Sequence, residues 1–275
     1  MKRLIYILIL ASVLLLGAAL MTGCAEGQDI VINLYTPSAT EISVPVPTLV
    51  PGSTREPTPE PTKSPYSPTV TQGNTPEGTP VAPDQSVFDD AALIGNSTFE
   101  GLYRYGIITH GHFFTKVGLN VLTVHTATTE HGTVPIIDEL NTGTYGKVIL
   151  MFGENELGWP SPASFIQKYE ELVDAVWARQ PQAEIYIVAM PPVTESYSTW
   201  ELMGVSNVNI QNFNAMMKDL ADRRGCHYID VPKELMTYNG ALPDEASGDG
   251  LHLNLKYARY WADHICLCVM GVYDQ

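Results

Sequence analysis

Few residues of this sequence carry positive charge. Its 275 residues include 15 Lys and Arg against 30 Asp and Glu, which gives a formal net charge of −15 at pH 7. Nucleic-acid backbones and anionic membrane surfaces repel such a chain, so we expect no nucleic-acid partner. Charged residues make up 16% of the chain and hydrophobic residues 45%, a balance that excludes a wholly disordered protein.

Motifs for nucleotides and metal ions are absent as well. The chain contains neither a P-loop nor a dinucleotide-binding glycine fingerprint. His110 and His112 are spaced as two residues on one face of a strand, but no cluster of carboxylates at fixed spacing accompanies them. We therefore predict no metal site and no cofactor.

Cysteine is scarce, with four residues in the chain. Cys266 and Cys268 are two positions apart, so they point in different directions from a helix and at most one of them can pair with Cys226. Buried thiols are the favoured state, and the pairing of Cys226 stays open at this stage.

The first 24 residues have the layout of a bacterial export signal. Lys2 and Arg3 precede an apolar run that extends from Leu4 to Met21. Residues 20–24, Leu-Met-Thr-Gly-Cys, resemble a lipobox, in which the cysteine is lipidated and becomes the mature N-terminus. We predict a signal peptide at residues 1–23 and a lipid on Cys24 that anchors an extracytoplasmic protein to the bacterial cell membrane. An uncleaved signal anchor is the alternative, with the same location.

The segment from residue 24 to residue 86 is rich in proline and threonine. Most of the 20 prolines lie between Pro37 and Pro83. Proline lacks a backbone donor and favours extended polyproline II, so this segment cannot build a core. We predict a disordered, semi-rigid linker that holds a domain away from the membrane; a proline-rich protein ligand is the alternative.

The predicted domain, residues 87–275, alternates short apolar runs with amphipathic periods. Runs at 91–94, 147–152 and 184–190 are typical of buried parallel strands, and 121–124 and 227–230 are weaker candidates. Apolar residues recur every three or four positions over 165–176, 210–220 and 257–265, which predicts helices. We expect a three-layer α/β/α fold, similar to flavodoxin, around a mainly parallel sheet of about five strands.

Polar residues follow the predicted strands, at the sheet edge where parallel sheets gather functional groups. Ser97 comes after the first strand, where it can act as a nucleophile, as a helix N-cap, or as both. Asn155 follows a later strand and can donate to an oxyanion. Asp249 precedes His252 by three positions, a spacing that lets the carboxylate hold the imidazole for proton transfer.

These clusters, in this order, resemble those of the SGNH (GDSL-type) hydrolases, and the resemblance extends from residue 87 to about residue 265. It implies Ser97 as nucleophile, with Asp249 and His252 completing the catalytic triad. Within Lys116-Val-Gly-Leu-Asn120 it points to Gly118, which would form the oxyanion hole with the backbone of Ser97 and the side chain of Asn155. Two positions depart from the family pattern, where Asn96 and Glu156 replace Asp.

The resemblance implies a serine esterase that works through an acyl-enzyme. Together with the predicted export, it suggests removal of small acyl groups, acetyl foremost, from carbohydrate or cell-wall polymer. An O-acyltransferase on a wall polymer and a non-catalytic carbohydrate-binding or adhesion module on the same fold are the alternatives. Trp159 and Trp200 lie on loops expected near the site, where they either stack on a sugar ring or pack their own loops.

Overall fold

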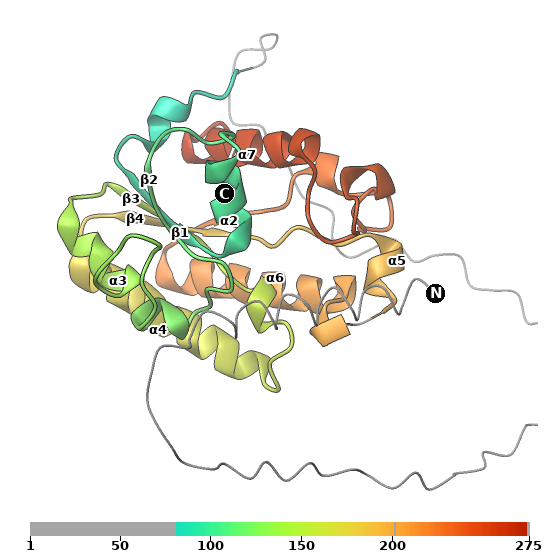
Figure 1. Cartoon of the computed structure of the whole chain (residues 1–275), viewed down its shortest axis with the longest axis horizontal. Helices are drawn as coiled ribbons and strands as arrows, with labels where there is room; N and C mark the ends of the chain where they lie inside the picture. The colour runs from blue at the N-terminus through green and yellow to red at the C-terminus, as the bar shows by residue number, and fades with distance from the viewer. Residues whose placement is uncertain (1–80, 201, 274–275) are drawn as a thin grey trace, which may run out of the picture. The chain divides into compact units, whose positions relative to one another are not determined.

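Five parallel strands form a single sheet in the computed structural model, which describes residues 81–200 and 202–273 (Figure 1). They are β1 (Ala91–Gly95), β2 (His112–Thr115), β3 (Lys147–Met151), β4 (Glu184–Val188) and β5 (His227–Ile229). Their order is β2-β1-β3-β4-β5. The predicted α/β fold is thus confirmed, whereas the predicted signal peptide, Cys24 and the predicted linker up to residue 80 lie outside the described residues.

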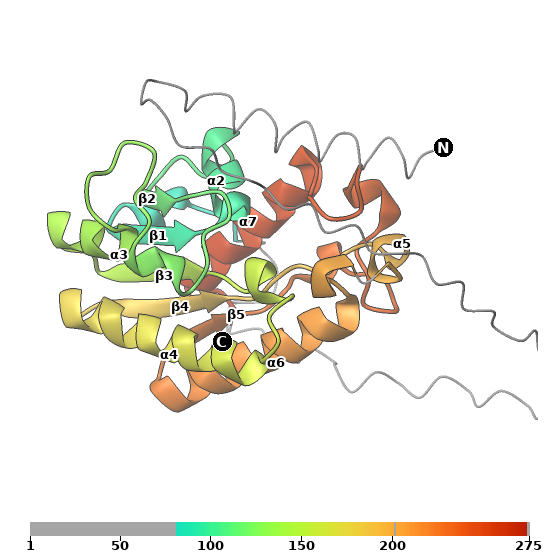
Figure 2. The same ribbon diagram turned by 60° about the horizontal axis from the view of Figure 1, so that its bottom comes forward.

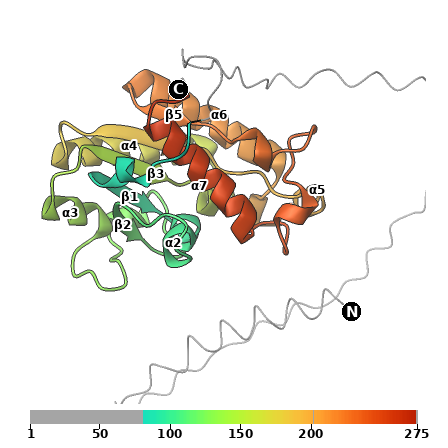
Figure 3. The same ribbon diagram turned by 90° about the horizontal axis from the view of Figure 1, so that it is seen from above.

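Helices cover both faces of the sheet. Helices α2 (Ser97–Arg104) and α7 (Leu255–Val269) lie over one face, and α4 (Pro162–Arg179) and α6 (Asn207–Arg224) lie over the other (Figures 2 and 3). Because both faces are covered, every residue of β1 is buried. The remaining elements are the short helices α3 (Ile136–Glu139) and α5 (Glu195–Ser198) and the 3₁₀ turns η1 (Gln85–Phe88), η2 (Thr123–His125), η3 (Leu140–Thr142), η4 (Glu154–Glu156), η5 (Leu202–Gly204), η6 (Lys233–Leu235) and η7 (Asp244–Ala246).

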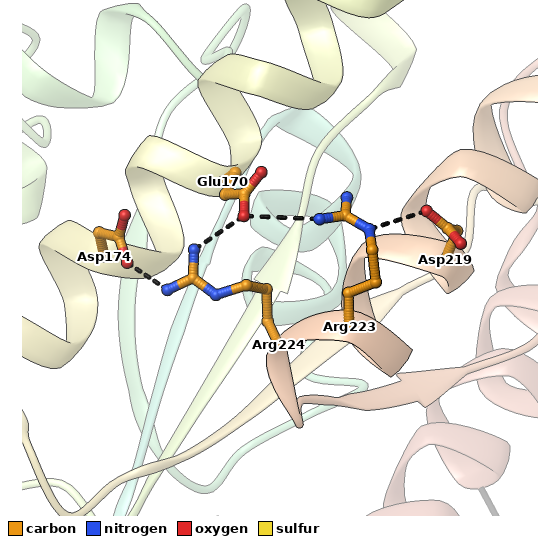
Figure 4. Close-up of polar contacts among 5 residues, drawn as sticks. All are labelled: Glu170, Asp174, Asp219, Arg223 and Arg224. Atoms are coloured by element: carbon orange, nitrogen blue, oxygen red, sulfur yellow. Dashed lines mark hydrogen bonds and ion pairs between the residues drawn. The ribbon is translucent and has the colours of Figure 1, made fainter.

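Helices α4 and α6 begin and end where their sequence signals place them. The Ser161 side chain accepts a hydrogen bond from the backbone N–H of Ser164, and Pro162 occupies the first turn of α4. Helix α6 ends at Gly225, which has a left-handed φ of 68° that a side chain would strain. Ion pairs then join the two helices: Arg224 contacts Glu170 and Asp174 of α4, and Arg223 contacts Glu170 (Figure 4). Arg223 also pairs with Asp219 within α6.

The predicted strand at 121–124 is wrong. The edge strand is instead β2, whose four residues are half-buried or exposed and therefore carry no continuous apolar signal. Val121 and Val124 are buried in a loop and in the turn η2. The backbone N–H of Val121 donates to the Glu156 side chain over 2.9 Å, so this apolar segment is satisfied without a neighbouring strand.

The cysteines of the described region are thiols. Cys226, Cys266 and Cys268 are present as thiols and not as disulfides, as the sequence favoured. Burial raises the pKa of Cys226 and of Cys266 to about 11, so neither thiol forms a reactive thiolate at neutral pH. Among residues 81–200 and 202–273, no helix has the length and apolar character needed to span a bilayer.

Candidate active site

A cavity of about 1200 Å³ collects segments that are far apart in the sequence. Its lining includes residues directly after β1, β3 and β4 and residues of the loop that precedes α7. This is the edge at which parallel sheets place their ligand sites. Three of the site residues that the sequence predicted line this cavity: Ser97, Asn155 and His252.

Ser97 is the first residue of α2, and its neighbour Asn96 is the N-cap. The Asn96 Oδ1 atom accepts the backbone N–H of Thr98 over 2.9 Å. The hypothesis that Ser97 caps the helix is therefore wrong, because Asn96 does so and leaves the Ser97 side chain to line the cavity. The backbone N–H groups in the first turn of a helix have no partner within that helix, so the N–H of Ser97 is suited to bind an anion.

Asp249 and His252 form one hydrogen-bonded unit before α7. Asp249 Oδ2 lies 2.7 Å from His252 Nδ1. Asp249 Oδ1 accepts the backbone N–H groups of Leu251 (2.9 Å) and His252 (2.8 Å) and the hydroxyl of Ser247 (3.0 Å). Burial alone would raise the pKa of Asp249, but the hydrogen bonds from His252 and Leu251 outweigh it and lower the pKa to about 2. Asp249 is therefore ionised at neutral pH and fixes the imidazole through Nδ1.

Asn155 joins η4 to the predicted Gly118 segment. Its Nδ2 donates to the carbonyl of Leu119 over 2.8 Å. An amide nitrogen carries two hydrogens, and the second remains for another acceptor. Gly118 has a φ of +75° and no described atom within 4 Å of the place a Cβ would take. Gly118 itself is not among the residues that line the cavity, although its neighbour Val117 is.

Glu156 occupies the position at which the sequence departs from the family pattern, and it is completely buried. Its carboxylate accepts the backbone N–H of Val121 (2.9 Å) and that of Gly153 (3.1 Å), so it ties β3's end to the loop after Gly118. Burial raises the pKa of Glu156 to about 7, partly opposed by these two hydrogen bonds. Glu156 thus accepts two backbone hydrogen bonds at the position where the family pattern has Asp.

The raised pKa of Glu156 predicts that the contribution of this group to the free energy of unfolding decreases as pH rises. A carboxyl whose pKa is higher in the folded state binds more protons there, so folding is favoured at low pH and this contribution is lost as pH rises from about 4.5 to about 7. For this group the loss is about 3 kcal/mol as an upper value. We expect the free energy of unfolding in urea to decrease less from pH 5 to pH 8 in Glu156→Gln than in the wild type; equal slopes would contradict the assignment.

The two tryptophans differ in their relation to the cavity. Trp159 lines it, as the sequence suggested. Trp200 is 65% exposed and is not part of the lining; its ring lies 5.9 Å from that of Tyr197, which does line the cavity. Within the described residues, no cluster of His, Cys, Asp and Glu is arranged to hold a metal ion.

Glu154 and Ser247 were missed by the sequence reasoning. Ser247 supports the Asp249 carboxylate, and Glu154 contacts both neighbours of Ser97. The only sequence signal for Glu154 is a carboxylate inside the Gly-x-Asn pattern, and its partners lie more than 50 positions away.

Comparison with protein families gives one match. Residues 94–259 match the family described as the GDSL-like lipase/acylhydrolase family. This range includes Ser97, Gly118, Asn155, Asp249 and His252. No curated protein matches the chain.

Solved structures share the fold at low sequence identity. A GDSL-like lipase from Bacteroides thetaiotaomicron is 12% identical with a TM-score of 0.51, over 70% of this chain and 92% of that chain. A protein from Slackia heliotrinireducens that is assigned to the SGNH hydrolases is 17% identical with a TM-score of 0.52, over 66% and 98%. A carbohydrate esterase family 2 enzyme from Myceliophthora fergusii, with its carbohydrate-binding domain, is 12% identical with a TM-score of 0.50, over 71% and 68%. At these identities the likeness establishes the fold.

Proposed function

Because this chain belongs to the GDSL-like lipase/acylhydrolase family and is a carboxylic ester hydrolase, we propose that it removes small acyl groups, acetyl foremost, from carbohydrate or cell-wall polymer. The observation that carries the proposal is the meeting of Ser97, Asn155 and His252 at one cavity, with Asp249 bonded to the imidazole.

Each residue has one task in the proposed reaction. His252 takes the hydroxyl proton of Ser97 through Nε2, because Nδ1 is held by Asp249, and Ser97 Oγ attacks the ester carbonyl. The N–H of Ser97 and the Asn155 amide, both of residues that line the cavity, stabilise the oxyanion. The family resemblance implies the N–H of Gly118 as the third donor, next to Val117 of the lining. His252 then protonates the leaving alcohol, and water, activated by the same imidazole, releases the acid from the acyl-enzyme.

Asn155 offers a graded test of the oxyanion hole. We expect Asn155→Ala to lower kcat for p-nitrophenyl acetate by about 100- to 1000-fold, the usual effect of losing one oxyanion donor. KM should change little, because the contact strengthens only as charge develops on the carbonyl oxygen. A kcat within threefold of the wild type would remove Asn155 from the oxyanion hole.

The cavity supports a substrate with both a ring and a small acyl group. The aromatic rings of Tyr105, Trp159 and Tyr197 line it, and flat apolar ring faces can stack on a sugar. The His252 side chain is 66% exposed, so water reaches the imidazole; this favours hydrolysis over transfer to a sugar hydroxyl.

The proposed location follows from the N-terminal sequence. A basic start, an apolar run and Cys24 in a lipobox-like setting favour export and a lipid anchor on the outer face of the cell membrane. Labelling of cells with radioactive palmitate tests this: the wild type should incorporate the label and Cys24→Ala should not.

The function is tested by acetate release. The purified protein should release acetate from O-acetylated glycans and hydrolyse p-nitrophenyl acetate faster than a long-chain ester. Hydrolysis of p-nitrophenyl acetate without acetate release from any glycan would reject the carbohydrate substrate. An acetylated glycan acceptor that gains acetyl groups faster than free acetate appears would instead identify a transferase.

A further inference from the structure

The two residues that flank Ser97 are both bound by one carboxylate oxygen. Glu154 Oε2 accepts the side-chain amide of Asn96 over 2.8 Å and the hydroxyl of Thr98 over 2.6 Å. Asn96 is completely buried, and its Oδ1 is used to cap α2 through the N–H of Thr98. The side chains of Asn96, Thr98 and Glu154 therefore form a closed polar ring around the backbone of Ser97.

The ring connects the nucleophile to the oxyanion donor. Glu154 directly precedes Asn155 in η4, and η4 follows β3, the strand that pairs with β1. The two strands approach closely at this end, because a Cβ on Gly95 would lie 2.9 Å from the carbonyl oxygen of Met151. A shift of α2 relative to η4 would break the ring, so the ring fixes the separation of Ser97 from Asn155.

We propose that Glu154 is a positioning residue for the nucleophile and that Asn96 is its matched partner, an inference that rests on the proposed role of Ser97. The carboxylate at position 154 needs donors at 96 and 98, and Asn supplies one where Asp would not. The departure from Asp at position 96 is thus a compensation for Glu154 and leaves the nucleophile in place.

Electrostatics support this pairing. Burial raises the pKa of Glu154, opposed by the hydrogen bonds from Thr98 and Asn96 and by the charge of His252. The other charged group that faces Glu154 is Glu156 on the same turn. In an environment that already disfavours one carboxylate, a second one at position 96 would face Glu154 across about 3 Å, and two such groups cannot both ionise without moving apart or sharing a proton.

The test exchanges the amide and the carboxylate. Asn96→Asp alone places two acceptors against each other, whereas Asn96→Asp with Glu154→Gln restores one donor and one acceptor in reversed order, and the Thr98 hydroxyl can turn to suit either. Asn212→Asp, on the exposed face of α6, adds the same charge without these contacts and is the matched control. Turnover of p-nitrophenyl acetate is measured at about pH 8.5, where a proton shared between the two carboxyls of the single variant is least favoured.

The expected result is a loss followed by a rescue. Asn96→Asp should lower kcat by about 10- to 100-fold, in line with the effect of displacing a catalytic group by about 1 Å. The double variant should regain at least about fivefold of that loss, and KM should change less than about twofold throughout. Rates are expressed per site titrated with a fluorophosphonate, so that misfolded protein does not count.

Two results would overturn the proposal. One is a kcat of Asn96→Asp within about threefold of the wild type, and the other is a double variant no faster than the single one. A wild type that neither hydrolyses p-nitrophenyl acetate nor reacts with the fluorophosphonate would instead reject the proposed function itself. The failure of the proposed function is distinguishable from the failure of the positioning proposal, because it shows in the wild type and requires no variant.

Discussion

Ser97→Ala is expected to abolish turnover of p-nitrophenyl acetate, with a loss in kcat of about a millionfold. The alanine removes the atom that attacks the carbonyl in the proposed reaction. Without it neither the tetrahedral intermediate nor the acyl-enzyme forms, so the oxyanion donors have no negative charge to stabilise. The fold should be unaffected, because Asn96 rather than Ser97 caps α2 and the hydroxyl of Ser97 faces the cavity. A fluorophosphonate probe should label the wild type and leave Ser97→Ala unlabelled.

Ser164→Ala is the matched control for this experiment. Ser164 is exposed in the first turn of α4, so its loss removes a hydroxyl of the same kind near the start of a different helix. This variant should keep full labelling and full turnover. If Ser97→Ala retained turnover, or if the probe still labelled it, Ser97 would not be the nucleophile.

The sequence predicts the central strands well because burial and sequence pattern coincide there. In β1, β3 and β4 continuous apolar runs are covered by helices on both faces, so composition alone identifies them. The sequence pattern does not predict β2, an edge strand whose four residues are half-buried or exposed and form no continuous apolar run. The apolar run at 121–124 misleads for the converse reason, since it is buried against the core while Glu156, not a strand, binds its backbone.

The site shows the same division between local and distant contacts. The bond between Asp249 and His252 joins residues three apart and follows from the turn that they share. The contact of Glu154 with Asn96 joins residues 58 positions apart and depends on β1 and β3 lying side by side. No local sequence pattern predicts such a contact. In the sequence alone, Asn96 is therefore seen only as a departure from the family pattern, and its contact with Glu154 is not apparent.

Asp249→Asn is expected to lower kcat by about 10⁴-fold while the protein stays folded. The Asn oxygen can take the place of Oδ1 and keep the hydrogen bonds from Leu251, His252 and Ser247. The amide nitrogen then replaces Oδ2 and presents hydrogens to Nδ1 of the imidazole. His252 is thereby forced into the tautomer that carries its proton on Nε2, and it cannot accept the proton of Ser97.

Ser247→Ala distinguishes the effect of the Asp249 charge from the effect of the hydrogen bond that Ser247 donates to it. This change removes one of the hydrogen bonds to Oδ1 but keeps the carboxylate and its 2.7 Å contact with His252 Nδ1. We expect it to cost less than about tenfold in kcat, because the two backbone N–H groups still orient Asp249. Equal losses in Asp249→Asn and Ser247→Ala, at matched unfolding midpoints, would mean that the carboxylate only shapes the loop. A loss in Asp249→Asn at least a hundredfold larger would show that its oxygen selects the tautomer that makes His252 a base.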